Sequence, residues 1–173
     1  MRRRIILLHI SSRIDYVANA SRPVWAVVGL SSNAERPAFS VARALLDHGR
    51  VVIPVNPRKE AAHDQRAYAS LLDIPQSQRV DVVDLFVASA NAGAVADDAI
   101  KRGAKAVWFQ LGVSDPPVRL TRLAVLQPQI LSICYALATL SLVRAPQAAQ
   151  RCRDAGLLVV EGTCPAIELQ RRS

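Results

Sequence analysis

The loop with the clearest chemical potential is Gly29-Leu30-Ser31-Ser32-Asn33-Ala34-Glu35-Arg36-Pro37, which follows the apolar run VWAVV. Gly29 permits a sharp turn at the end of a strand, and Pro37 suits the first turn of a helix. Backbone N–H groups at such a helix start, with Arg36 beside them, form a site for a phosphate or diphosphate. The alternative is an ordinary serine-rich turn that caps a helix. We favour the phosphate site because the loop lies at the carboxyl end of a strand.

The end of the second apolar run reads Pro54-Val55-Asn56-Pro57-Arg58-Lys59. It contains no carboxylate to hold a free ribose diol, and the dinucleotide fingerprint GxGxxG is absent, so NAD is disfavoured. Arg58 and Lys59 can instead pair with a phosphate on an adenosine ribose, a feature shared by coenzyme A and NADP. The alternative is that both are solvated loop cations.

Other chemically active residues form no convincing constellation. The three cysteines make no CxxC pair, so a metal site is not expected. Cys164, in the turn Thr163-Cys164-Pro165, has no histidine or carboxylate placed by the sequence to activate it, and we expect a structural or ligand-lining role. Asp81 and Asp84 are a candidate carboxylate pair, although hydrogen bonding at a strand end is the expected role.

The elements that position these residues follow a repeated pattern of a helix, a glycine and a short β-branched run, around Gly49, Gly103 and Gly156. Each glycine suits a left-handed helix cap, and alternating helices and strands indicate a parallel sheet. We expect an α/β fold, a doubly wound, Rossmann-like three-layer sandwich with a five-stranded parallel sheet. Strands are expected near 24–29, 51–56, 80–86, 105–110 and 157–161, and helices near 37–48, 64–72, 91–102 and 145–155.

The composition suits one domain, because the 173 residues are 51% hydrophobic and 21% charged. The formal net charge of +8 favours anionic partners such as nucleotide phosphates, nucleic acid or anionic membrane. The basic residues are spread along the chain without interleaved aromatics, and no nucleic-acid-binding motif is recognisable. We therefore expect a small nucleotide and no nucleic acid.

Two segments depart from the pattern. Residues 1–22 resemble a leader, unstructured or targeting, and we expect a cytoplasmic protein with mitochondria as the alternative. Residues 117–145 form an apolar insertion whose uncharged part, 123–143, is long enough to span a bilayer. Pro128 and its flanking glutamines disfavour a span. The insertion is expected to pack on the domain or in a homo-oligomer contact, and a translated intron is the alternative.

Six motifs occur in order along the chain: GLSSNAERP, VIPVNPR, YASLLDIP, VDVVDLF, KAVWFQLGV and TCPAIE. Together they resemble the small CoA-binding proteins related to the CoA-binding domain of the succinyl-CoA synthetase alpha subunit. The resemblance runs from about residue 24 to 112 and resumes from about 148 to 168. Within it, residues 23–173 form the CoA-binding domain, interrupted by the insertion. Members commonly carry an arginine where this chain has Val87.

The resemblance implies a set of ligand-binding residues. The diphosphate is expected on Gly29, Leu30, Ser31, Ser32 and Asn33, with Arg36 and Pro37 at the helix start. The adenosine end is expected near Val55, Asn56, Pro57 and Arg58, with Phe86 lining the pocket and Gln110, Leu111 and Gly112 beside the same crevice.

The expected function is non-catalytic binding of coenzyme A or an acyl-CoA. The alternative is an NADP-dependent oxidoreductase or another NAD(P)-binding protein. An oxidoreductase needs a proton donor such as a Tyr-Lys pair, and none is evident around Tyr16, Tyr68 or Tyr135.

Overall fold

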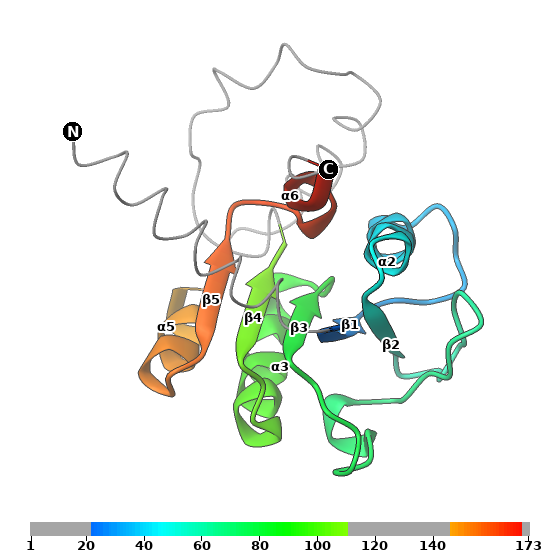
Figure 1. Ribbon diagram of the computed structural model, residues 1–173. Helices are drawn as coiled ribbons and strands as arrows, with labels where there is room; N and C mark the ends of the chain where they lie inside the picture. Colours follow the sequence, from blue (N-terminus) through cyan, green and yellow to red (C-terminus); the bar gives the residue numbers. More distant parts are fainter. Residues whose placement is uncertain (1–21, 111–145, 171–173) are drawn as a thin grey trace, which may run out of the picture.

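The computed structural model describes residues 22–110 and 146–170. One sheet of five parallel strands forms the centre of the molecule (Figure 1). Its strands are β1 (Val24–Val28), β2 (Val51–Val55), β3 (Val82–Leu85), β4 (Ala106–Phe109) and β5 (Leu158–Glu161).

The strand order is β2-β1-β3-β4-β5. The chain steps from β1 to β2 on one side and then returns across β1 to add β3 on the other. Val28 at the end of β1 is in register with Val55 of β2 and Leu85 of β3. The direction of winding therefore reverses between β1 and β3, and a doubly wound sheet opens a ligand crevice at the carboxyl end of such a point.

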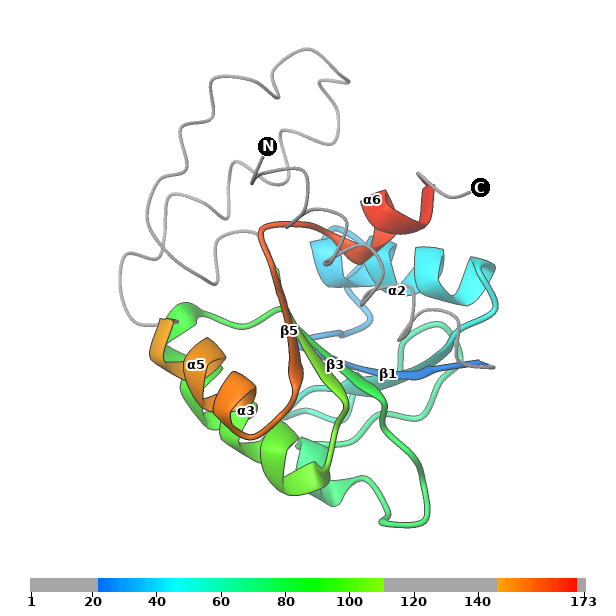
Figure 2. The ribbon, with the colours of Figure 1, turned by 60° about the vertical axis from the view of Figure 1, so that its left-hand side comes forward.

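Helices cover both faces of the sheet, which gives the three layers seen in Figure 2. One face carries α2 (Pro37–Asp47) and α6 (Pro165–Gln170), and the other carries α3 (Ser89–Arg102), α5 (Pro146–Asp154) and the short 3-10 turn η1 (Leu71–Asp73). The doubly wound three-layer fold expected from the sequence is thereby confirmed.

Strand residues alternate between two apolar clusters because successive side chains point to opposite faces. Trp25 and Val27 of β1 pack toward α2, while Ala26 and Val28 pack toward α3 and α5. The helices complete these clusters with small side chains, such as Ala92, Ala96 and Ala99 of α3. Close helix packing on both faces fixes the strand ends, where the candidate site lies.

The predicted glycine caps are confirmed, since Gly49, Gly103 and Gly156 have φ angles of 73°, 72° and 84°. The helix predicted over residues 64–72 is wrong. His63 and Asp64 adopt left-handed backbone angles of 50° and 59°, which end any helix there. Tyr68 instead makes a parallel bridge to β2, with its N–H donating to Pro54 O at 3.0 Å. The helices expected from the sequence do not include α6.

The segments 1–21 and 111–145 lie outside the described residues, so the leader and the insertion remain expectations. Within residues 22–110 and 146–170, no helix has the length and apolar character needed to cross a membrane.

Candidate functional site

The candidate site lies where four neighbouring strands end. Gly29 follows β1, Asn56 follows β2, Phe86 follows β3 and Gln110 follows β4. Two helices begin beside this edge, since α2 follows the β1 loop and α3 starts three residues after Phe86. Carboxyl strand ends and helix N-termini together favour an anionic ligand.

Gly29 brings the loop after β1 close to β3. Its N–H donates to Val55 O at 2.8 Å, and its φ of 97° lies in the left-handed region. A Cβ on residue 29 would lie 3.0 Å from the carbonyl carbon of Phe86 and closer still to the oxygen. Only glycine fits this approach, as the sequence predicted for a tight turn at the strand end.

The loop after Gly29 is a run of short turns. The N–H of Asn33 lies 3.4 Å from Ser31 Oγ, and Asn33 Oδ1 accepts from the N–H of Glu35 at 2.9 Å. Arg36 is the N-cap of α2, with Pro37 at the first helical position. The Arg36 side chain is exposed and makes no capping hydrogen bond. The helix start thus lacks a side-chain oxygen from its own cap residue, and the Arg36 guanidinium adds positive charge beside it.

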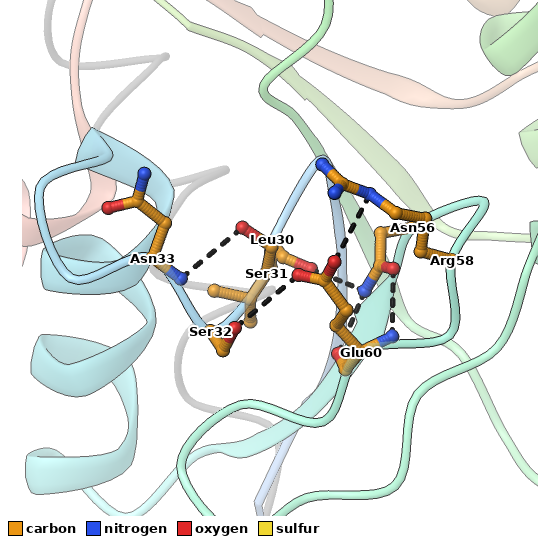
Figure 3. A network of polar contacts seen from close by, with 7 residues as sticks. All are labelled: Leu30, Ser31, Ser32, Asn33, Asn56, Arg58 and Glu60. Carbon is orange, nitrogen blue, oxygen red and sulfur yellow. Dashed lines mark hydrogen bonds and ion pairs between the residues drawn. The ribbon is translucent and has the colours of Figure 1, made fainter.

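Asn56 ties the β1 loop to the loop after β2 (Figure 3). Its side chain is buried, and Nδ2 donates to Leu30 O at 2.8 Å and to Glu60 O at 2.9 Å. Its Oδ1 accepts from the N–H of Glu60 at 2.9 Å. One amide therefore fixes both loops relative to each other, a role that the sequence did not indicate.

Glu60 corrects the expectation that no carboxylate accompanies the end of the second strand. The chain turns at Lys59, whose φ is 54°, and brings Glu60 back toward the β1 loop. The carboxylate of Glu60 accepts from Ser32 Oγ at 3.4 Å and pairs with Arg58 Nε at 3.1 Å. The sequence signal was Asn56-Pro57, a dipeptide typical of a turn that returns the chain to its start.

Asp84 and Gln110 form a buried pair on adjacent strand ends. Gln110 Nε2 donates to Asp84 Oδ1 at 2.7 Å, and both side chains are buried. Asp84 Oδ2 has no hydrogen-bond partner in the described part of the chain. Burial raises the pKa of Asp84 to about 8, although the hydrogen bonds from Gln110 and Leu85 oppose the shift. Asp84 is therefore a neutral carboxylic acid below that pH.

Asp81 directly precedes β3, at the amino ends of the strands, and does not pair with Asp84. Its carboxylate accepts from the N–H of Val24 at 3.0 Å and lies within 3.0 Å of Arg79 Nε and Lys105 Nζ. Burial opposes ionisation, but these hydrogen bonds and cations outweigh it and hold the pKa of Asp81 below its usual value. This is the strand-end hydrogen bonding expected for Asp81.

Cys164 lies in a turn anchored to the sheet, because the carbonyl of Thr163 accepts from Trp108 Nε1 at 2.8 Å. The side chain of Cys164 is half-buried against the α2 face. The rings of His48 and His63 each bond a backbone carbonyl of α2. Among the described residues, no group of three or more His, Cys, Asp or Glu is arranged to hold a metal ion.

Most of the residues expected at the site do gather at this edge. The structure brings together the β1 loop, the β2 loop and Phe86. Gln110 is buried one strand further along, and Pro57 is exposed in the β2 loop. Val87 is half-buried against the α3 face. Leu111 and Gly112 lie outside the described residues.

A comparison with family models matches residues 23–170 to the model described as CoA binding domain. Among curated proteins, the uncharacterized protein YneT of Bacillus subtilis is 35% identical over 88 residues. That match covers 51% of this chain and 64% of the relative, less than two thirds of its length.

Solved structures share the fold. A hypothetical protein from Pyrococcus horikoshii is 30% identical, with a TM-score of 0.70 over 93% of this chain and 90% of that chain. An acetyl-coenzyme A synthetase 1 from Ca. Korarchaeum cryptofilum is 23% identical, with a TM-score of 0.56 over 80% of this chain and 25% of that chain. The second likeness concerns the fold alone.

Proposed function

This chain belongs to the CoA binding domain family, and from that premise we propose that it binds coenzyme A, free or acylated, at the carboxyl ends of β1 to β4. Binding is proposed to be non-catalytic. The ligand has two anionic parts, a diphosphate and a phosphate on the adenosine ribose, and the edge of the sheet offers a separate group of donors for each.

The diphosphate is assigned to the loop from Gly29 to Asn33 and to the start of α2. The missing Cβ at Gly29 lets the loop turn directly against the carbonyl of Phe86, which holds its later backbone N–H groups at the carboxyl end of β1. The N-terminus of α2 and the exposed guanidinium of Arg36 supply positive charge. Ser31 and Ser32 add hydroxyl donors, which bind phosphate without further charge.

The ribose phosphate is assigned to the loop after β2. Arg58 is 77% exposed, and its ion pair with Glu60 uses Nε. A guanidinium carries five N–H donors and binds phosphate in a bidentate manner, so the pair with Glu60 is compatible with phosphate binding. Lys59 adds a second cation in the same turn. Phe86, half-buried beside Gly29, gives the adenosine an apolar contact. The Val55 side chain is 1% exposed and belongs to the core, so only its backbone lies at the site.

The observation that carries the proposal is that hydrogen bonds hold the β1 loop and the β2 loop in a fixed arrangement. Asn56 bonds Leu30 O in one loop and both backbone groups of Glu60 in the other. The donors for the diphosphate and the cation for the ribose phosphate are thus held together before any ligand arrives. Such preorganisation lowers the ordering cost of binding.

Calorimetric titration with coenzyme A, dephospho-coenzyme A and NADP tests the proposal. We expect coenzyme A to bind most tightly and dephospho-coenzyme A to bind more weakly, because it lacks the ribose phosphate. Arg36→Ala is expected to weaken both by about tenfold, through loss of a charged hydrogen bond to the diphosphate. Arg43→Ala removes an exposed arginine that pairs with Asp47 and is the matched control. NADP binding as tight as coenzyme A binding would overturn the assignment.

A further inference from the structure

Glu60 is the group at this edge that the proposed function leaves without a role. Its carboxylate stands between the loop assigned to the diphosphate and the arginine assigned to the ribose phosphate. A carboxylate near phosphate sites is unfavourable unless it accepts a hydrogen bond from the ligand or is neutralised. The presence of the Glu60 carboxylate between two proposed phosphate sites therefore needs an explanation.

Both polar groups of the Glu60 backbone are hydrogen-bonded to one side chain. Asn56 bonds both its N–H and its C=O, each at 2.9 Å. Lys59, just before it, is a non-glycine residue with a φ of 54°. Left-handed angles in such residues cost free energy and cluster at functional sites. The chain accepts this strain in the turn that directs Glu60 toward Ser32.

The contacts of Glu60 do not explain this arrangement by stability alone. Arg58 is 77% exposed and Glu60 is 29% exposed, and ion pairs near the surface contribute little to folding. The hydrogen bond from Ser32 is long, at 3.4 Å. A carboxylate offers about four lone-pair directions, and these two contacts use two of them. Capacity remains for a hydroxyl donor.

The pair matches the chemistry of a ribose that carries one phosphate and one free hydroxyl. Arg58 suits the phosphate, and Glu60 beside it suits the neighbouring hydroxyl, because carboxylates accept hydrogen bonds from ribose hydroxyls at this edge of such folds. Resting on the proposed function, we infer that Glu60 is a specificity-determining residue that accepts the free 2′-hydroxyl of the adenosine ribose while Arg58 binds the 3′-phosphate. Figure 3 shows the Arg58 guanidinium facing the Glu60 carboxylate beside the Asn56 side chain.

A thermodynamic cycle isolates this contact. The ligands are adenosine 3′,5′-bisphosphate and its 2′-deoxy analogue, which carry the same charge and differ by one hydroxyl. The wild-type protein is expected to bind the 2′-deoxy analogue about tenfold more weakly, since a hydrogen bond to a charged acceptor is lost. In Glu60→Ala, the two ligands are expected to bind within about twofold of each other, because the cycle removes only the shared contact.

Asp47→Ala is the matched control, because Asp47 is an exposed carboxylate that pairs with an exposed arginine, Arg43, away from the proposed site. It is expected to keep the wild-type discrimination. Thermal unfolding of Glu60→Ala is measured alongside, and Glu60→Gln serves if the alanine variant unfolds. The glutamine variant removes the charge and is expected to reduce the discrimination to about threefold, as a neutral acceptor is weaker.

The outcomes separate this inference from the proposed function. Equal binding of the two bisphosphates by the wild-type protein, with coenzyme A still bound, overturns the role of Glu60 alone. Discrimination that persists in Glu60→Ala overturns it as well. If neither coenzyme A nor adenosine 3′,5′-bisphosphate binds the wild-type protein, both the inference and the proposed function fail.

Discussion

The Cα of Gly29 faces the carbonyl group of Phe86 so closely that a Cβ on residue 29 would overlap the Phe86 oxygen. The two residues directly follow β1 and β3, the strands between which the winding of the sheet reverses. The contact holds the proposed diphosphate loop at the point where doubly wound sheets place their ligands.

Gly29→Ala is expected to destabilise the fold and to abolish binding of coenzyme A, because the added Cβ displaces the loop or the end of β3. Overpacking of this kind costs about 1–3 kcal/mol in the free energy of unfolding. Gly49→Ala is the control, since Gly49 also has a left-handed φ, 73°, but nothing lies within 4 Å of the added Cβ. Urea unfolding of the two variants measures the difference. Equal destabilisation would mean that the approach to Phe86 carries no cost.

Arg58→Ala is expected to weaken coenzyme A by about tenfold while leaving dephospho-coenzyme A within about twofold, because Arg58 is assigned to the ribose phosphate alone. Calorimetry with both ligands measures this selectivity. Arg43→Ala removes the same charge from an exposed position on α2. A parallel loss for both ligands would show that Arg58 acts through general charge and not through that phosphate.

Asn56→Ala is expected to lower the free energy of unfolding by about 2–4 kcal/mol, since it leaves the carbonyl of Leu30 and backbone groups of Glu60 without their partner. Thermal or urea unfolding checks the value, and coenzyme A binding is expected to weaken because the two loops separate. Asn91→Ala, an exposed asparagine in α3, is the control. A variant as stable as the wild-type protein would remove Asn56 from its structural role.

Asp84→Asn is expected to change the pH dependence of stability. Because the pKa of Asp84 is raised to about 8 from its ordinary 3.8, the folded state retains a proton that the unfolded state releases. The free energy of unfolding therefore falls as pH rises from about 4 to about 8, by up to about 1.4 kcal/mol per pH unit, and levels off above that range. Asparagine does not titrate, and its Oδ1 still accepts from Gln110.

The measurement is urea unfolding of both proteins at several pH values, with the difference between them as the readout. That difference isolates Asp84 from groups such as Asp81, whose lowered pKa makes stability fall at acidic pH instead. Parallel pH profiles for the two proteins would show that Asp84 is ionised in the folded state.

The sheet was predictable because strands buried on both faces leave continuous apolar runs, and because glycines such as Gly103 end helices in a recognisable way. The segment around Tyr68 was not predictable. Its apolar spacing suits a helix, but its pairing with β2 is a contact between distant residues. A local sequence pattern carries no information about such a contact, so helix propensity alone decided the prediction.

The β1 loop of the candidate site was evident from the sequence, because its glycine, serines and proline each have a local reason to be there. Asn56 and Glu60 were less evident, since their roles depend on a turn that brings them back to Leu30 and Ser32. The buried pair of Asp84 and Gln110 depends on the register of β3 and β4, which no single strand reveals.

The most direct test of the central claim is to map coenzyme A onto the protein by NMR, following backbone amide signals during a titration. We predict that the amide signals of residues 29–36 and, apart from Pro57, of residues 55–60 shift and saturate together, while those at the other end of the strands, including Val24 and Asp81, stay unchanged. Saturating binding that leaves residues 29–36 unshifted, or no binding of coenzyme A at all, would contradict the account.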